Sequence, residues 1–147
     1  MRLVVQRVSS ASVTVDGQTR ASIGTGLVVL VGFTAGDVPA MVDWSAEKLS
    51  TLRIFPDEQG KMNLSVADVA GGILLVPNFT LAGDASKGRR PSFDKAMPPA
   101  EASTHFDRLC ELVAARGIAT QRGVFREHMH VALVNDGPVT IVIDAPA

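Results

Sequence analysis

Two short apolar segments constrain the fold of this 147-residue chain more than any other feature of its sequence. They are Leu27–Val31 and Ile73–Val76, and each directly follows a glycine. An uninterrupted apolar run of this length, rich in β-branched residues, is typical of a strand buried on both faces of a sheet. Both segments are much too short to span a bilayer. We therefore expect them to form the central strands of a sheet.

Apolar residues and turn residues predict further strands on both sides of this centre. An N-terminal strand leads into Val13–Val15, and the Asp16-Gly17 pair that follows indicates a tight turn. A shorter strand is expected at Arg53–Phe55, ended by the turn-rich Pro56–Gly60. Near the C-terminus, apolar residues alternate at Met129, Val131 and Leu133 and predict a strand. Asn135–Pro138 then predicts a hairpin turn, and Val139–Ile143 predicts the returning strand.

Two segments carry the periodicity of amphipathic helices. The first begins near Asp37, a candidate N-cap, and has Pro39 in its first turn. Its apolar residues recur at helical spacing and are interrupted only by Ser45; they are Val38, Val42, Leu49 and Leu52. The second begins at Pro98-Pro99, ends at Gly117, and has one apolar face. That face consists of Ala102, Phe106, Leu109, Cys110 and Val113.

This order of elements predicts a mixed α/β (α+β) fold. Several strands with two main helices that do not alternate strictly with them favour mixed, largely antiparallel sheets or a partial barrel, with both helices on one side. No repeat, linker or low-complexity segment divides the chain, so we expect a single domain over residues 1–147.

Composition excludes several classes of protein. Apolar residues make up 46% of the chain, which excludes intrinsic disorder, and the net charge of −1 excludes a strongly basic nucleic-acid coat. The single cysteine, Cys110, lies within a helical apolar pattern, so we expect a buried structural thiol in a reducing compartment. We expect a soluble, cytoplasmic protein with no membrane contact.

Histidines offer little support for familiar side-chain catalysis. The chain has only His105, which we place on the solvent side of the second helix, and His128 and His130, which share one face of a strand. A metal site would need a third ligand that the spacing does not supply. No phosphate-binding glycine loop and no zinc-type cysteine spacing occurs. We therefore expect neither a metal nor a cofactor.

Backbone groups after the second central strand are a stronger catalytic candidate. Pro77 lacks a backbone donor, which leaves the amides of Asn78, Phe79 and Thr80 at the strand's end. Such amides can hold an oxyanion, and one donor contributes about 2.7–4 kcal/mol in acyl-transfer enzymes. The alternative interpretation is an ordinary exit from a strand into a loop.

A basic segment follows. Lys87, Arg89 and Arg90 place three cations in four positions between Asp84 and Phe93. Such a segment can bind phosphates through point charge or through paired arginine donors. A solvated loop without a ligand is an equally good interpretation, because short charge clusters are common.

Four blocks of sequence together resemble the D-aminoacyl-tRNA deacylase family. They are Met1–Val8, Phe79-Thr80-Leu81, Lys87–Phe93 and Asn135–Thr140, and the resemblance extends over essentially the whole chain. It implies hydrolysis of the ester bond of D-aminoacyl-tRNA as proofreading during translation. Its partners would be the 3′ end of aminoacyl-tRNA and a second copy of the chain, and no cofactor is implied.

The resemblance also implies how the enantiomers are distinguished. Gly137 and Pro138, joined by a cis peptide bond, would enter the partner's active site, where their carbonyls exclude an L side chain. Because exclusion does not require binding of the D side chain, many D-amino acids can be accepted. Glycine has no side chain to exclude, so glycyl-tRNA, including glycine mischarged on an alanine tRNA, is expected to be hydrolysed too.

This chain departs from the family pattern at two places. Pro77 and Asn78 stand where the family has Ser-Gln, and Arg126 stands where it usually has glycine. With a proline at the first position, this chain is also similar to an animal relative that edits L-alanine from a threonine tRNA. The context of the Gly-Pro pair differs from that of the relative. Phe125 and Met129 keep the family pattern and would enclose the terminal adenine, or else serve as core residues.

The resemblance leaves the mechanism open between two routes. In one, a ribose hydroxyl of the substrate assists water while the amides near Phe79 and Thr80 hold the oxyanion. In the other, Thr80 is the nucleophile, although no histidine is identified to activate it. A Thr80→Ala variant and a tRNA ending in 2′-deoxyadenosine separate these routes. A tRNA-end-binding module without activity and an esterase for small esters remain alternatives to the deacylase.

Overall fold

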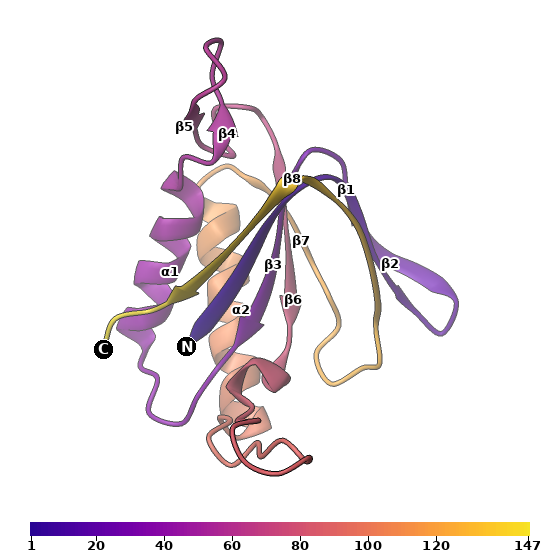
Figure 1. Ribbon diagram of the computed structural model, residues 1–147, viewed down its shortest axis with the longest axis vertical. Coiled ribbons are helices and arrows are strands. Elements are labelled where there is room, and N and C mark those ends of the chain that lie inside the picture. Colours follow the sequence, from indigo (N-terminus) through magenta and orange to yellow (C-terminus); the bar gives the residue numbers. More distant parts are fainter.

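The two apolar segments lie side by side at the centre of a six-stranded sheet in the computed structural model, which describes residues 1–147 (Figure 1). β3 (Gly26–Gly32) and β6 (Gly72–Pro77) are parallel, and all their residues are buried except the half-buried Leu30 and Pro77. Gly26 pairs with Gly72, and a Cβ atom on Gly26 would lie 1.9 Å from the Gly72 carbonyl oxygen. Glycine is therefore required where these strands begin.

The N-terminal strand, β1 (Arg2–Val15), pairs with other strands along both of its own edges. On one edge it pairs antiparallel with β3 and then with β2 (Gln18–Ile23), to which the predicted Asp16-Gly17 turn connects it. On its other edge it pairs antiparallel with β8 (His130–Asp144). The sheet order is β2-β1-β3-β6-β7, with β7 at Ala119–Arg122.

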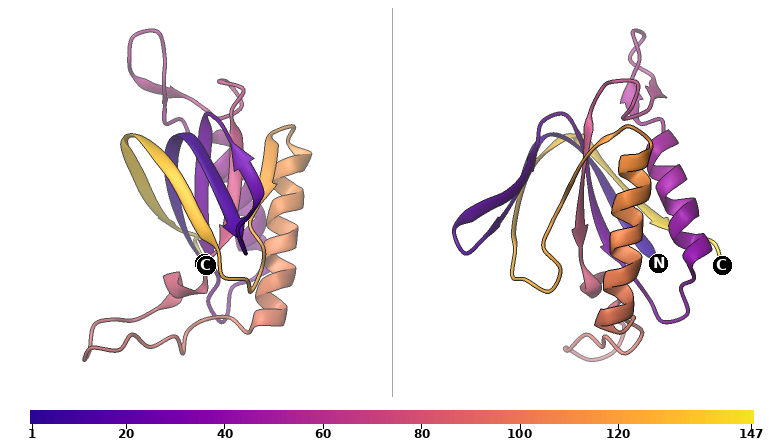
Figure 2. Two further views of the ribbon diagram at one scale, coloured as in Figure 1. Left: turned by 90° about the vertical axis from the view of Figure 1, so that its right-hand side faces the viewer. Right: turned by 180° about the vertical axis from the view of Figure 1, so that it is seen from behind.

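Both helices cover one face of this sheet, as Figure 2 shows from two sides. α1 (Pro39–Thr51) packs against α2 (Pro99–Ala115), and Arg108 on α2 donates two hydrogen bonds to the Asp43 carboxylate on α1. A main core of 25 residues lies between the helices and the sheet. A second cluster of 8 residues lies on the opposite face, where the curved sheet forms a partial barrel. The predicted fold class is confirmed.

Alternate residues of the central strands supply these two clusters. Leu27, Val29 and Val31 of β3 belong to the main core, whereas Val28 belongs to the second cluster. Strand β1 contributes to both clusters because its register shifts on either side of Val8. Neither helix is both long and apolar enough to cross a membrane.

The second helix agrees with its prediction, and the first differs at its start. Gly117 follows α2 with a φ of +79°, the left-handed conformation that glycine adopts readily at a helix end. In α1 the N-cap is Val38, whereas Asp37 binds elsewhere. The buried Asp37 carboxylate accepts the Thr34 amide at 2.7 Å and the Met1 ammonium at 2.5 Å. Tertiary contacts therefore displace the predicted cap.

Three other sequence-based predictions are wrong. The expected strand at Arg53–Phe55 is reduced to β4 (Phe55–Pro56), which pairs with β5 (Met62–Leu64) in a separate two-stranded sheet. His105 does not face solvent: it is 9% exposed and its ring packs edge-on against Phe33. The predicted hairpin at Asn135–Pro138 is also absent.

β8 continues through that segment as one strand bent by an irregularity. Gln6 of β1 pairs with Thr140, and Val8, two residues later, pairs with Asn135. Six residues of β8 (135–140) thus stand against three of β1 (6–8), and the extra residues form a bulge. The bulge contains Gly137 and Pro138, whose peptide bond is cis.

Candidate active site

The chain leaves the central strands through a short 3-10 helix, η1 (Phe79–Ala82). The Asn78 amide donates to the Val31 carbonyl at 2.8 Å, which extends the parallel pairing by one bond. Gly32 makes close packing possible here, because a Cβ atom at this position would lie 2.6 Å from Leu81 Cβ. The turn is therefore held against the ends of β3 and β6, the edge where open α/β sheets place their ligands.

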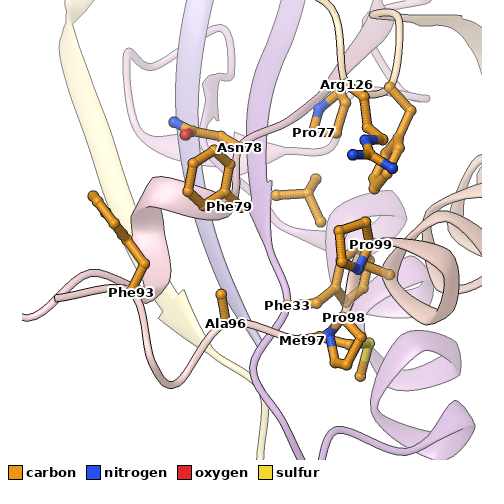
Figure 3. A pocket seen from close by; sticks show the side chains of 13 residues that line it. Phe33, Pro77, Asn78, Phe79, Phe93, Ala96, Met97, Pro98, Pro99 and Arg126 are labelled. Atoms are coloured by element: carbon orange, nitrogen blue, oxygen red, sulfur yellow. The ribbon is translucent and has the colours of Figure 1, made fainter.

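Two hollows lie on either side of this turn and share Pro77, Asn78, Phe79 and Arg126. The first has a volume of about 490 Å³, and most of its lining residues are apolar (Figure 3). They are Val31, Phe33, Phe93, Ala96, Met97, Pro98, Pro99, Ala102 and Phe125 in addition to the shared four. The second has a volume of about 660 Å³ and is more polar. It adds Gln6, Leu30, Val76, Thr80, Glu127, His128, Met129, Val131 and Leu133.

The structure narrows the set of candidate amide donors. The Asn78 amide is already bound to Val31, so the prediction that it serves as a free donor is wrong. The amides of Phe79 and Thr80 open η1 and have no acceptor within their own helix. Phe79 lines both hollows and its side chain is 61% exposed. Two donors thus remain at the boundary between the hollows.

Thr80 has a hydrogen-bond partner other than a histidine. Its hydroxyl donates to Asn78 Oδ1 at 2.5 Å. His128 lines the same hollow as Thr80, but the two side chains share no hydrogen bond. The His128 ring instead packs edge-on against His130. The geometry therefore provides no activating base for a Thr80 nucleophile.

Phe125 and Met129, predicted to enclose one adenine, line different hollows. Phe125 is half-buried in the apolar hollow and packs on Phe106. Met129 lines the polar hollow, where its sulfur accepts the Val124 amide at 3.3 Å. Arg126 lies between them in the chain with a φ of +65°, a left-handed conformation that glycine adopts more readily than arginine. Phe125 alone remains a stacking surface in the apolar hollow.

Gly137 and Pro138 are exposed and line neither hollow of their own chain. Their bulge is held from both sides. The Asn135 side chain accepts the Val139 amide at 2.7 Å and donates to the Val139 carbonyl at 3.1 Å. The buried Arg7 guanidinium donates to the carbonyls of Asp136 at 2.8 Å and Ile54 at 2.7 Å. The Gly-Pro pair is therefore an exposed part of the surface that hydrogen bonds hold in place.

Other reactive groups lie outside the hollows. Burial raises the pKa of the Cys110 thiol to about 11, so the buried, protonated cysteine is structural as predicted. Nowhere do three His, Cys, Asp or Glu side chains form a group that could hold a metal ion. Gln6 and His128 are lining residues that sequence reasoning missed; long-range pairing of β1 with β3 and with β8 brings Gln6 here.

Comparisons with known proteins identify the family of this chain. A family model described as D-Tyr-tRNA(Tyr) deacylase matches residues 4–144. A D-aminoacyl-tRNA deacylase of Myxococcus xanthus is 54% identical over 99% of this chain and 95% of its own length. Another, from Pelobacter propionicus, is 51% identical over 98% of this chain and 99% of its own. A solved structure titled c-Myc DNA Unwinding Element Binding Protein is 39% identical and superposes with a TM-score of 0.94, covering 100% of both chains. The chain therefore belongs to the D-Tyr-tRNA(Tyr) deacylase family.

Proposed function

We propose that this chain hydrolyses the ester bond between a D-amino acid and the terminal ribose of tRNA. Family membership over nearly the whole chain supports this reaction. The observation that carries it is the pair of amide donors, Phe79 and Thr80, at the boundary between an apolar and a polar hollow. Charged tRNA is used in the cytoplasm, and we place the protein there.

The two hollows suit the two parts of the substrate's end. The apolar hollow, with Phe125 and Phe33 in its wall, fits a flat base, and stacking of a base on an aromatic ring is worth about 1–3 kcal/mol. The polar hollow, with Gln6 and Thr80, then receives the amino acid. The ester lies between them, beside the amides that open η1.

The reaction depends mainly on the backbone and on the substrate. As water attacks the ester carbonyl, the developing oxyanion accepts hydrogen bonds from the Phe79 and Thr80 amides. The neighbouring ribose hydroxyl of the substrate positions the water. Thr80 Oγ1 donates to Asn78 and helps to hold the turn, which supports a positioning role rather than a nucleophilic one.

A homodimer with shared sites completes the proposal. Gly137 and Pro138 are exposed and line neither hollow of their own chain, so they are free to enter the partner's polar hollow and exclude L side chains. β8 pairs only with β1 and exposes Val134 and Val142 by 57% and 59%. A long edge strand with exposed valines is a surface that a second copy can cover. Glycyl-tRNA passes this filter because it has no side chain to exclude.

Release of the amino acid from matched substrates tests the proposal. D-aminoacyl-tRNA and glycyl-tRNA should be hydrolysed, whereas L-aminoacyl-tRNA and a simple ester without RNA should not. Binding without turnover would instead indicate a nucleic-acid-binding module, the activity named for the 39% identical relative. Hydrolysis of the simple ester at the same rate would indicate a general esterase. Equal hydrolysis of D and L substrates would contradict the role of Gly137 and Pro138.

A further inference from the structure

We propose that the segment Asp84–Phe93, called here the basic loop, binds the phosphodiester backbone of the tRNA strand that carries the amino acid. This inference rests on the proposed function, because it assumes that the strand's 3′ end occupies the two hollows. It assigns a second contact, outside the hollows, to a part of the chain that the reaction itself does not use. The contact would supply affinity for polynucleotide rather than chemistry at the ester.

The cations of the basic loop are unpaired. Lys87, Arg89 and Arg90 are all exposed, and none of them takes part in an ion pair or a side-chain hydrogen bond. This differs from the exposed arginines Arg2 and Arg108, each of which pairs with an aspartate. Unpaired cations lose little when they bind phosphate, because no existing pair has to be broken.

The one carboxylate at the base of the loop is used by the loop itself. Asp84 accepts the Ser86 amide at 2.9 Å, and hydrogen bonding from the Ser86 side chain, followed by that from its amide, holds the pKa of Asp84 below its ordinary value. The backbone of Asp84 also exchanges two hydrogen bonds with Ser92, at 2.8 and 2.9 Å. These bonds close the loop at its base and leave the three cations at its outer end. Figure 2 shows the segment extending away from the sheet and the helices.

The basic loop is joined directly to the apolar hollow. Phe93, its last residue, lines this hollow and packs edge-on against Phe79, with 5.3 Å between ring centroids. In Figure 3 Phe93 lies beside Phe79, on the side of the hollow away from Pro99 and Arg126. A nucleic acid whose terminal base lies in the hollow must continue outward past its rim. The cations therefore lie along one available exit.

Net charge supports a local rather than a general attraction. Residues 84–95 contain four cations and two carboxylates, whereas the whole chain has a net charge of −1. This segment thus carries a net charge of +2 in a chain whose net charge is slightly negative. Each phosphate neutralised by such a cation releases counterions, so binding weakens as salt is added.

The experiment compares two variants of equal charge change on two substrates. One variant is Lys87→Ala with Arg89→Ala and Arg90→Ala. The control replaces three exposed, unpaired cations elsewhere, Arg20, Arg53 and Lys61, by alanine. The long substrate is D-aminoacyl-tRNA, and the short one is the same amino acid esterified to adenosine, which has no phosphate.

We expect the loop variant to raise the KM for D-aminoacyl-tRNA about tenfold and to reduce the slope of log affinity against log salt by about 2–3. Its hydrolysis of the adenosine ester should equal that of wild type, which also shows that the variant is folded. The control variant should change neither the KM for D-aminoacyl-tRNA nor the salt slope. Equal losses on both substrates, an unchanged salt slope, or the same effect in the control would overturn the inference. If wild type hydrolyses neither substrate, the proposed function fails instead.

Discussion

At the scale of single residues, the site depends on atoms that side-chain replacement leaves in place. The donors proposed to hold the oxyanion belong to the backbone, so alanine substitutions in η1 test the side chains alone. Proline removes a backbone donor, and Phe79 is a suitable position for it. The preceding residue, Asn78, is extended, with φ of −146° and ψ of 90°, and the first position of a helix accepts proline.

A Phe79→Pro variant should therefore lose catalysis while keeping the turn. We expect kcat to fall about 10²–10³-fold, the effect of removing one oxyanion donor. Phe79→Ala is the matched control, because it removes the same ring but keeps the amide; its kcat should stay much closer to wild type. Single-turnover hydrolysis of D-aminoacyl-tRNA measures both. Equal kcat values for the two variants would exclude a role for the Phe79 amide.

The buried thiol of Cys110 gives a pH dependence with a definite sign. Burial raises its pKa from 9.0 to about 11, so between these values the unfolded chain loses its proton before the folded chain does. The free energy of unfolding should therefore be at its full value below pH 9 and fall by about 2–3 kcal/mol as the pH rises through 11. Urea denaturation from pH 8 to 11 measures this, and Cys110→Ala should lack this component of the slope.

At the scale of elements, the sequence predicted those that are determined by local patterns. The helix at Pro99–Ala115 combines two prolines, a glycine end and a continuous apolar face, and it was predicted closely. The central strands were predicted because burial on both faces requires an apolar residue at every position. Neither prediction needed knowledge of a distant partner.

The elements that failed are those decided by distant pairing. Asn135–Pro138 contains turn-forming residues, yet β1 pairs with the chain on both sides of them and keeps it one strand. The same pairing divides the apolar residues of β8: Leu133 packs on the second cluster and Ile141 on the main core. The position of the Phe79 and Thr80 amides could be predicted because they follow a recognisable strand end. The separation of Phe125 from Met129 could not.

The start of the central strand pair should be the least tolerant position in the sheet. In Gly26→Ala the new methyl carbon would lie 1.9 Å from the Gly72 carbonyl oxygen, so β3 and β6 must separate. We expect a loss of about 3 kcal/mol or more in the free energy of unfolding. Gly24→Ala is the control, because its methyl group meets nothing within 4 Å and its change should stay within about 0.5 kcal/mol. Urea denaturation compares them, and similar losses would contradict the close approach.

At the scale of the whole molecule, the proposed substrate surface and the proposed partner surface are separate. The hollows and the basic loop lie where β6 ends, whereas the Gly137-Pro138 bulge lies in the edge strand β8, of which only Val131 and Leu133 line a hollow. In the proposed homodimer each subunit thus holds the reaction for one substrate and supplies stereochemical control for the other. In that proposal, activity and selectivity at one site come from different polypeptides.

This division predicts that a catalytically inactive subunit can restore discrimination between D and L substrates to a subunit that has lost it. Take a Gly137→Ala subunit, whose methyl group would lie 2.5 Å from the Val139 nitrogen and displace the bulge, and mix it with excess Phe79→Pro subunit. Alone, the first should hydrolyse D and L esters alike and the second almost nothing. After exchange, most working sites face an intact bulge, so the ratio of D to L turnover should climb back towards that of wild type. If the ratio of D to L turnover does not change as inactive subunit is added, each polypeptide excludes L substrates from its own site.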